Sequence, residues 1–242
     1  MSPGDRSMIR FRFGLRPLAE IAPWGGDRPN LSWFGLTDGW YWIELGDVDL
    51  LRHLPEDGDE HPAVDYYVAR FWEDLLRLFP AVIEDVPAAL VDLLRSDPRT
   101  WPELDPDDPV TDSVLTWSTD HFLDVGYLGN APTIRCWRHG DQVTIGWQDS
   151  DPSRYTAPPS GEVTVSLSEF LAAVGDLHQA LITAMETRVA EVIAAPPPHV
   201  AIDLTQLRAE QADRATWLSH ATARQPATNW SHIHTAAHRI HP

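Results

Sequence analysis

One short segment of the sequence carries the side chains that acid–base chemistry uses most often, two carboxylates and an imidazole. They belong to Asp120, His121 and Asp124, and general acid–base catalysis relies mainly on such groups. If the segment is a strand, at ~3.3 Å per residue, the two aspartates share one face about 13 Å apart. Paired glycosidase carboxylates stand about 5–9.5 Å apart, so this pair alone cannot do that chemistry.

His121 has two interpretations. In a strand it shares a face with apolar and aromatic side chains, namely Trp117, Leu123, Val125 and Tyr127. These neighbours favour a hydrogen-bonded histidine of the core over a general base. A carboxylate from elsewhere in the chain, Asp38 or Glu44, would reverse that choice. The catalytic candidates for an enzyme are therefore Asp120, His121, Tyr127, Arg135 and His139.

Three histidines near the C-terminus have the spacing of a metal site. His234, His238 and His241 stand at i, i+4 and i+7, so a helix would present them on one face. Such spacing can chelate zinc, but no carboxylate accompanies them and terminal residues fray. Their shared face also depends on the helical register, so a metal site is the less favoured interpretation. The chain has no P-loop, GxGxxG, HExxH, GxSxG or CxxC signature, so we expect no cofactor.

Three tryptophans surround an Asp-Gly pair in WFGLTDGWYWIELGD, residues 33–47. Asp-Gly between apolar residues predicts a two-residue hairpin turn at Asp38 and Gly39, because both turn residues must take positive φ. The alternation of side chains then creates two faces. The core face holds Phe34, Leu36, Tyr41, Ile43 and Leu45. The aromatic face holds Trp33, Gly35, Thr37, Trp40, Trp42 and Glu44.

The aromatic face has two interpretations. A helix packed over it would make the hairpin a central pair in a sheet buried on both sides, and this is the favoured alternative. Without that cover, Trp33, Trp40 and Trp42 would anchor a peptide, a protein partner or a sugar, because tryptophan is enriched where interfaces need rigid contact area. Thr37 and Glu44 would complete the binding surface.

The elements that position these residues follow from hydrophobic periodicity and turn signals. Strand patterns cover residues 8–13, 116–149 (an antiparallel meander) and 162–166. Helical patterns cover residues 63–79, a segment after Pro87, 167–194, 203–223 and 230–240. Ser166 and Glu169 form a capping box at the start of the long helix. We therefore predict an α+β fold, an antiparallel sheet of hairpins packed against several helices, including the long helix near 167–194.

The meander contains a Gly140-Asp141 turn, which predicts a second hairpin. Its pairing gives one shared face to Ile134, Cys136, Arg138, Val143, Ile145 and Trp147. Cys136 is then buried and structural, because no nearby group would activate its thiol. A single cysteine excludes an internal disulfide and fits a reducing compartment.

The chain is strongly acidic. It has 36 Asp and Glu residues against 18 basic residues, all of them arginine, and a net charge of -18. The span from Glu44 to Asp124 alone holds 21 Asp and Glu residues against 5 Arg. Such a surface repels nucleic-acid phosphates and anionic lipids and attracts basic partners. A solvated acidic face is the structural alternative.

Targeting and domain signals are few. The N-terminus lacks the apolar segment of a secretion signal, and no run reaches the roughly 18 apolar residues of a membrane span, so we expect a cytoplasmic protein. The length suits one α+β domain, residues 1–242, with residues 1–7 and about 226–242 flexible. A boundary in the Pro- and Asp-rich segment 96–112 is the alternative.

Four segments of the sequence are characteristic, and the similarity that they carry spans most of the chain. They are MIRFRFGLRPLAEIAPWG, FGLTDGWYWIELGD, VDYYVARFWEDLL and LDVGYLGNAPTIRCWRHGDQVTIGW. Together they resemble an actinobacterial family known only as a domain of unknown function. The resemblance implies a GC-rich bacterial source and one full-length domain rather than two. It transfers no catalytic residue.

Two functions are compatible with these observations. The first is a cytoplasmic interaction protein, such as an immunity-type inhibitor of a basic toxin or enzyme, because opposite charge speeds encounter and buried aromatics supply affinity. The alternative is an enzyme or small-ligand binder of bacterial specialised metabolism, with a pocket between the sheet and the long helix. Neither nucleic acid nor a membrane is expected as a partner, while a small-molecule ligand stays open.

Overall fold

The computed structural model describes residues 8–27, 29–54, 63–149, 151 and 153–240. It has an α+β fold with two antiparallel sheets and several helices, as predicted. Sheet 1 contains β1 (Ile9–Leu15), β2 (Gly39–Leu45), β3 (Val48–Leu50) and β4 (Val64–Asp65). Its order is β1-β2-β3, and β4 also pairs with β2. Sheet 2 has the order β5-β6-β7-β8 and contains β5 (Phe122–Leu123), β6 (Thr133–His139), β7 (Gln142–Gln148) and β8 (Ser160–Ser166).

The α-helices are α1 (Val68–Ile83), α2 (Val91–Arg95), α3 (Pro109–Asp120), α4 (Leu167–Ala194), α5 (Leu204–Arg214), α6 (Trp217–Ala223) and α7 (Trp230–Ile240). Short 3-10 helices are η1 (Leu18–Glu20), η2 (Gly35–Thr37), η3 (Ala88–Leu90), η4 (Pro98–Thr100) and η5 (Gly126–Leu128). None of the helices within the described ranges is long and apolar enough to cross a membrane.

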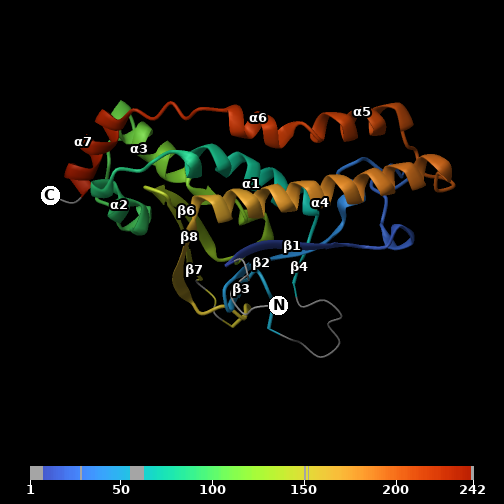
Figure 1. Ribbon diagram of the computed structural model, residues 1–242, viewed down its shortest axis with the longest axis horizontal. Coiled ribbons are helices and arrows are strands. Elements are labelled where there is room, and N and C mark those ends of the chain that lie inside the picture. The colour runs from blue at the N-terminus through green and yellow to red at the C-terminus, as the bar shows by residue number, and fades with distance from the viewer. Residues whose placement is uncertain (1–7, 28, 55–62, 150, 152, 241–242) are drawn as a thin grey trace.

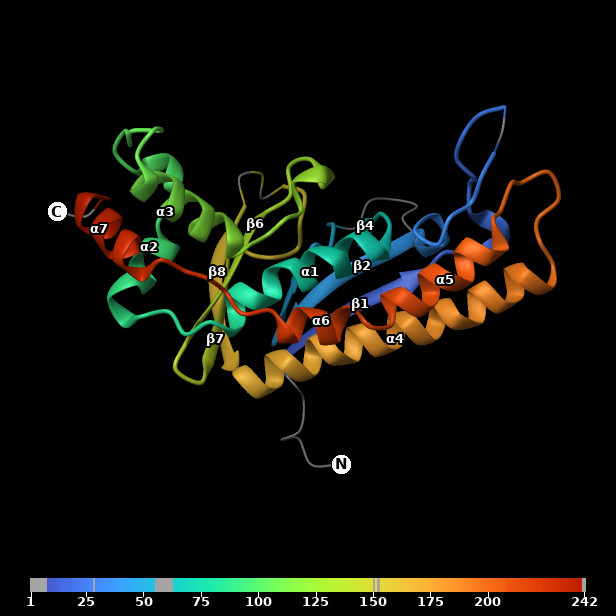
Figure 2. The ribbon, with the colours of Figure 1, turned by 90° about the horizontal axis from the view of Figure 1, so that it is seen from above.

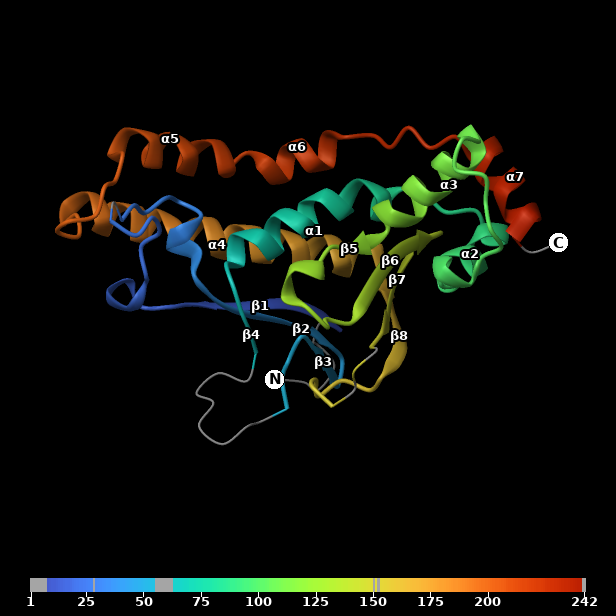
Figure 3. The same ribbon diagram turned by 180° about the vertical axis from the view of Figure 1, so that it is seen from behind.

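Sheet 1 carries helices on one of its two faces (Figure 1). α4 packs on β1 and α1 packs on β2, while α5 and α6 form a further layer on α4 and α1. Figure 2 shows the same stack from above, so the helices lie in front of the strands of sheet 1. Sheet 2 stands at one end of the stack, and α2, α3 and α7 lie beyond it (Figure 3). α7 packs on α3, and its buried side chains are Ile233, Ala236 and Ile240.

The long helix is confirmed as α4, and so is its capping box. The Ser166 hydroxyl accepts a hydrogen bond from the Glu169 backbone N–H at 3.2 Å, and the Glu169 carboxylate accepts one from the Ser166 N–H at 3.0 Å. These bonds satisfy N–H groups that have no partner inside the helix. The buried side chains of α4 are Phe170, Ala173, Val174, Leu177, His178, Leu181, Met185, Val189 and Val192.

The predicted turn in the meander is also confirmed. β6 and β7 pair up to His139↔Gln142, which leaves Gly140 and Asp141 as a two-residue loop. Cys136 is buried on the predicted face, where desolvation raises the pKa of its thiol to about 12. The thiol is therefore protonated and unreactive at neutral pH.

The hairpin predicted at residues 33–47 is wrong. Gly35–Thr37 form the 3-10 helix η2, and Asp38 is extended, with φ -52° and ψ 130° instead of the positive φ of a tight turn. β2 pairs with β1 in a register that places Gly14 opposite Trp40. A long-range strand partner along the whole of β2 therefore outweighs the local turn preference of Asp-Gly.

The strand predicted for Asp120, His121 and Asp124 is wrong as well. α3 extends to Asp120, and strand β5 covers only the two residues after His121. Asp108 starts this helix, because its carboxylate accepts a backbone N–H two residues further on at 2.9 Å and a proline occupies the first turn. Asp120 and His121 therefore lie at the C-terminal end of a helix, and the strand-based spacing does not apply.

Two helices differ from their predicted bounds. The helix predicted at 63–79 begins later, because Val64–Asp65 pairs with β2, and α1 continues through Pro80 to Ile83. The helix predicted at 203–223 is divided into α5 and α6. Asp203 caps α5 as expected from its side chain, since it accepts two backbone N–H groups of the first turn.

Candidate functional site

Trp33 does not lie on the predicted aromatic face. It is fully buried, and its indole N–H donates to the Gln211 side chain on α5 at 2.6 Å. The Arg214 guanidinium lies 4.3 Å from the centroid of the Trp33 ring and 4.6 Å from that of Trp217, and it also pairs with Glu73 on α1. Trp33 therefore packs against α5 and stabilises the position of α5 and α6, and it does not lie on a surface where it could bind another protein.

Thr37 is a structural residue too. Its hydroxyl donates to the Phe34 carbonyl at 2.7 Å and accepts the Ala69 backbone N–H at 3.1 Å. α1 begins after Tyr67 without a side-chain cap of its own. Thr37 therefore supplies a hydrogen-bond acceptor to the first turn of α1 from a distant part of the chain.

The other predicted residues share one face of sheet 1. We call the set Arg10, Arg12, Trp40, Trp42 and Glu44 the outer surface, and all five side chains are half-buried. In the β1–β2 register, Arg12 stands opposite Trp42 and Arg10 opposite Glu44. The Arg12 Nε donates to one Glu44 carboxylate oxygen at 3.0 Å, and the Trp42 indole N–H donates to the other at 3.4 Å.

Both indoles of the outer surface are held in place by neighbouring groups. Trp40 occupies the space above Gly14, where a methyl group in place of the glycine hydrogen would come within 2.4 Å of the ring. The Arg52 guanidinium lies 5.5 Å from the centroid of Trp42, a cation–π contact. Side chains that are ordered before binding lose less conformational entropy when a partner arrives.

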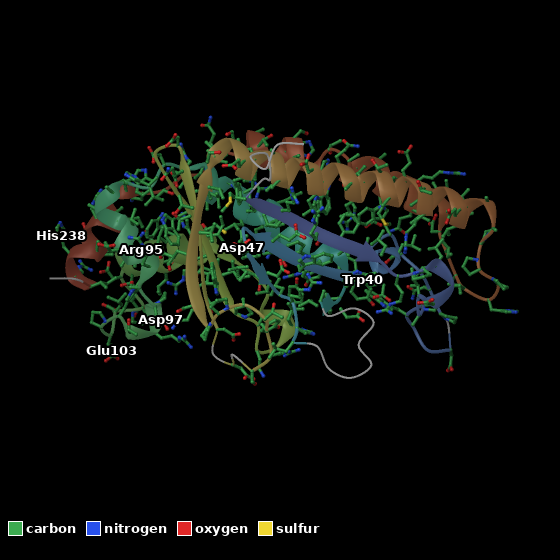
Figure 4. All side chains as sticks on the ribbon, turned by 60° about the horizontal axis from the view of Figure 1, so that its bottom comes forward. Trp40, Asp47, Arg95, Asp97, Glu103 and His238 are labelled. Atoms are coloured by element: carbon green, nitrogen blue, oxygen red, sulfur yellow. The ribbon has the colours of Figure 1, made fainter. Side chains whose placement is uncertain are left out.

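Among the described residues, no helix covers the outer surface. α1 and α4 lie on the opposite face of sheet 1 (Figure 1), and in Figure 4, where Trp40 is labelled, β1 and β2 lie in front of the helices. For the residues that the structure describes, the favoured alternative of a helix packed over this face therefore does not apply to Trp40 and Trp42, whereas Trp33 is buried.

Asp120 and His121 line the same cavity, which we call the α1–α3 cavity. Its volume is about 490 Å³, and it lies between α1, the end of α3 and residues 224–229, which lead to α7. α1 contributes Arg77 to its lining, and Glu84 contributes from the position directly after the helix. The cavity therefore lies away from the space between sheet 1 and α4, where a pocket was expected.

His121 is the hydrogen-bonded core histidine that its neighbours suggested. It is fully buried, and its Nδ1 donates to the Trp117 carbonyl at 2.7 Å. Desolvation lowers its pKa to about 4, so the ring is neutral at pH 7. Its Nε2 is then a hydrogen-bond acceptor, and this buried atom has no hydrogen-bond partner within the described part of the chain.

A second cavity, of about 340 Å³, shares Arg77 and Asp120 with the first and is also lined by Asp74. One Asp74 oxygen accepts the Arg70 Nε at 2.9 Å, whereas the other is buried without a hydrogen bond. Burial raises the pKa of Asp74 to about 7. Sequence reasoning missed this residue, although an aspartate on the buried stripe of α1 was a detectable signal.

The other three catalytic candidates do not join this pair. The Tyr127 hydroxyl lies 2.9 Å from the Tyr41 hydroxyl. Arg135 donates to a carbonyl at the end of α2 at 2.8 Å, and the His139 Nδ1 donates to a carbonyl ahead of α2 at 2.9 Å. The five candidates therefore do not form one catalytic arrangement.

The histidines proposed for a metal site are on α7 or beyond it. His234 and His238 are exposed, and Figure 4 places His238 at the end of the molecule far from Trp40. His241 lies outside the described residues. Within the described ranges, no three His, Cys, Asp or Glu side chains gather in a way that could hold a metal ion.

Comparison with known proteins identifies a family without assigning an activity. Residues 10–236 match the model of a family of unknown function, DUF5984. No curated protein and no solved structure matches the chain. Since the family model covers nearly the whole sequence, the chain belongs to the DUF5984 family.

Proposed function

We propose that this protein is a cytoplasmic interaction module that binds a basic protein through the outer surface of sheet 1, as an immunity-type inhibitor would. One observation carries the proposal: Trp40 and Trp42 lie on a sheet face without helical cover among the described residues, in positions that their neighbours fix. Tryptophan and arginine are among the residues most enriched where a few side chains dominate the binding energy of an interface.

Charge and aromatic contact have separate roles in this proposal. On the outer surface itself, Arg10 and Arg12 face Glu44, so local attraction does not select a basic partner. The net charge of -18 acts at longer range and raises the rate at which a basic protein arrives. The two indoles then supply the contact area that slows dissociation.

Affinity capture from the lysate of the native host tests the proposal. Wild-type protein should retain one basic protein, and the double variant Trp40→Ala/Trp42→Ala should retain at least tenfold less of it, because an interface tryptophan is worth about 2 kcal/mol or more. Leu171→Ala is the matched control, since Leu171 is an apolar side chain on α4 that is 38% exposed. Its recovery should equal that of the wild type.

A second variant covers the case in which the double variant does not fold, as judged by circular dichroism. Asp47 lies exposed in the turn between β2 and β3, so Asp47→Arg reverses a charge beside the outer surface without removing any packing. It should lower recovery of the basic protein. Equal recovery with the wild type and with every folded variant would contradict the proposal.

A small-ligand binder or an enzyme is the second candidate. The observation that favours it is the shared position of Asp120 and His121 on one cavity of about 490 Å³, a volume within the range of about 300–1,000 Å³ that small-molecule sites occupy.

A further inference from the structure

The lining of the α1–α3 cavity includes polar groups that have no hydrogen-bond partner among the described residues, and one of them is the buried indole N–H donor of Trp117. Asp120 is an exposed residue whose carboxylate makes no hydrogen bond or ion pair with any described residue, and partial desolvation raises its pKa. The buried Nε2 of His121 is an acceptor without a donor among the described residues. In the adjoining cavity, a buried oxygen of Asp74 lacks a hydrogen bond but lies 3.6 Å from the Arg77 guanidinium, with which it forms an ion pair. Of these groups only the exposed Asp120 carboxylate is open to a ligand, and a ligand with donor groups would supply the partner that it lacks among the described residues.

The charges around the cavity favour a cation. Carboxylates of Glu84, Asp112 and Asp120 line it together with the guanidinium groups of Arg77 and Arg224. Arg77 is already engaged, because it lies 3.6 Å from Asp74 and 3.8 Å from Asp124. An anion would therefore meet more carboxylates than free guanidinium groups.

The side chains that line the cavity favour an organic cation over a metal ion. No group of three metal-ligating side chains is present within the described ranges, and the apolar part of the wall is formed by Pro80, Ala81, Trp117 and Ile233. A cation with an apolar body would place its charged group at Asp120 and its body against the indole of Trp117.

We propose that the α1–α3 cavity binds an ammonium or guanidinium group attached to a small apolar body, with Asp120 as its counter-ion. The group can belong to a free amine or to an arginine side chain of another protein. This inference rests on the small-ligand candidate above and not on the outer surface, so Trp40→Ala/Trp42→Ala should leave binding in the cavity unchanged.

Matched pairs of probes test the charge requirement by isothermal titration calorimetry. Benzylamine is compared with benzyl alcohol, and N-acetyl-arginine amide with N-acetyl-citrulline amide, because each pair differs mainly in charge. We expect at least one cation to bind at least tenfold more tightly than its neutral analogue. Tighter binding of benzylamine assigns the site to a free amine, and tighter binding of the arginine derivative assigns it to a protein side chain; both support the proposal.

Asp120→Asn should remove most of this preference, with at least a tenfold loss of affinity for the cation. Asp176→Asn is the matched control, since Asp176 is a residue of α4 outside the cavity lining, and it should bind like the wild type. If Asp120→Asn does not fold, Thr116→Arg places a guanidinium in the cavity wall and should block the probe. Equal binding of charged and neutral probes, or no binding of either cation, overturns the proposal.

Discussion

His121 and Asp74 are buried side chains whose surroundings favour the neutral form. Desolvation lowers the pKa of His121 to about 4 and raises that of Asp74 to about 7. The same physical cause acts in opposite directions because the imidazole is charged when protonated and the carboxylate when deprotonated. Protonation should therefore destabilise the folded protein through His121 and stabilise it through Asp74.

His121 makes stability rise with pH between about 4 and its ordinary value of 6.5, because the unfolded chain binds the proton in that window and the folded chain does not. The full effect is about 3 kcal/mol. Urea unfolding at pH 4 and pH 7 measures this effect. Between these two pH values, the free energy of unfolding of the wild type should rise by about that amount more than the free energy of unfolding of His121→Gln. Parallel behaviour of the two proteins would show that the imidazole is solvated when folded.

Asp74 acts in the opposite sense. Its folded pKa lies above the ordinary value of 3.8, so the free energy of unfolding falls as pH rises from about 4 to about 7. Asp74→Asn cannot ionise and should be spared this loss, so the wild type should become less stable relative to the variant over the same window. Asp92→Asn, at a carboxylate that is 87% exposed, is the control that should not change the slope. If the wild type instead becomes more stable than Asp74→Asn as pH rises, the pKa of Asp74 is not raised in the folded protein.

Among the helices and strands, sequence motifs correctly predicted the features that depend on residues close together in the sequence. The capping box of α4 and the Gly140-Asp141 turn are formed by neighbours in sequence, and both were predictable. The hairpin at Asp38 failed because β2 takes its partner from β1, a choice that no local pattern records. The helix α3 was missed although Asp108 and the following proline are a helix start signal.

The outer surface was likewise predictable only where it depends on local sequence. Trp40, Trp42 and Glu44 share a face because alternation along one strand is a local property. Trp33 was wrongly placed with them, because its position depended on the turn that does not form. Its contacts with Gln211 and Arg214 join segments far apart in the sequence, and sequence spacing carries no information on such contacts.

Thr37 provides a test of how a distant segment stabilises an element. Thr37→Val keeps the shape of the side chain but removes the acceptor for the first turn of α1, so the free energy of unfolding should fall by about 1–3 kcal/mol. Thr37→Ser keeps the hydroxyl and should retain most of that stability. Urea unfolding measures both, and equal losses in the two variants would mean that packing, not the hydrogen bond to Ala69, determines the effect.

At the scale of the whole molecule, the acidic charge and the outer surface should affect binding kinetics differently. Charges separated by more than about 10 Å are screened at 0.1 M salt. Raising salt from about 0.05 to 0.3 M should therefore lower the association rate of the basic partner several-fold and change its dissociation rate little. Trp42→Ala should instead mainly speed dissociation. Surface plasmon resonance separates the two rates, and a salt effect confined to dissociation would argue against steering by net charge.

The most direct test of the interaction proposal is the native mass of untagged protein recovered gently from the lysate of its host. We predict a species heavier than the 27.2 kDa chain by the mass of a basic protein, and this species should be absent for folded Trp40→Ala/Trp42→Ala. A mass equal to the chain alone would contradict the proposal. So would a protein complex that persists unchanged when both tryptophans are replaced.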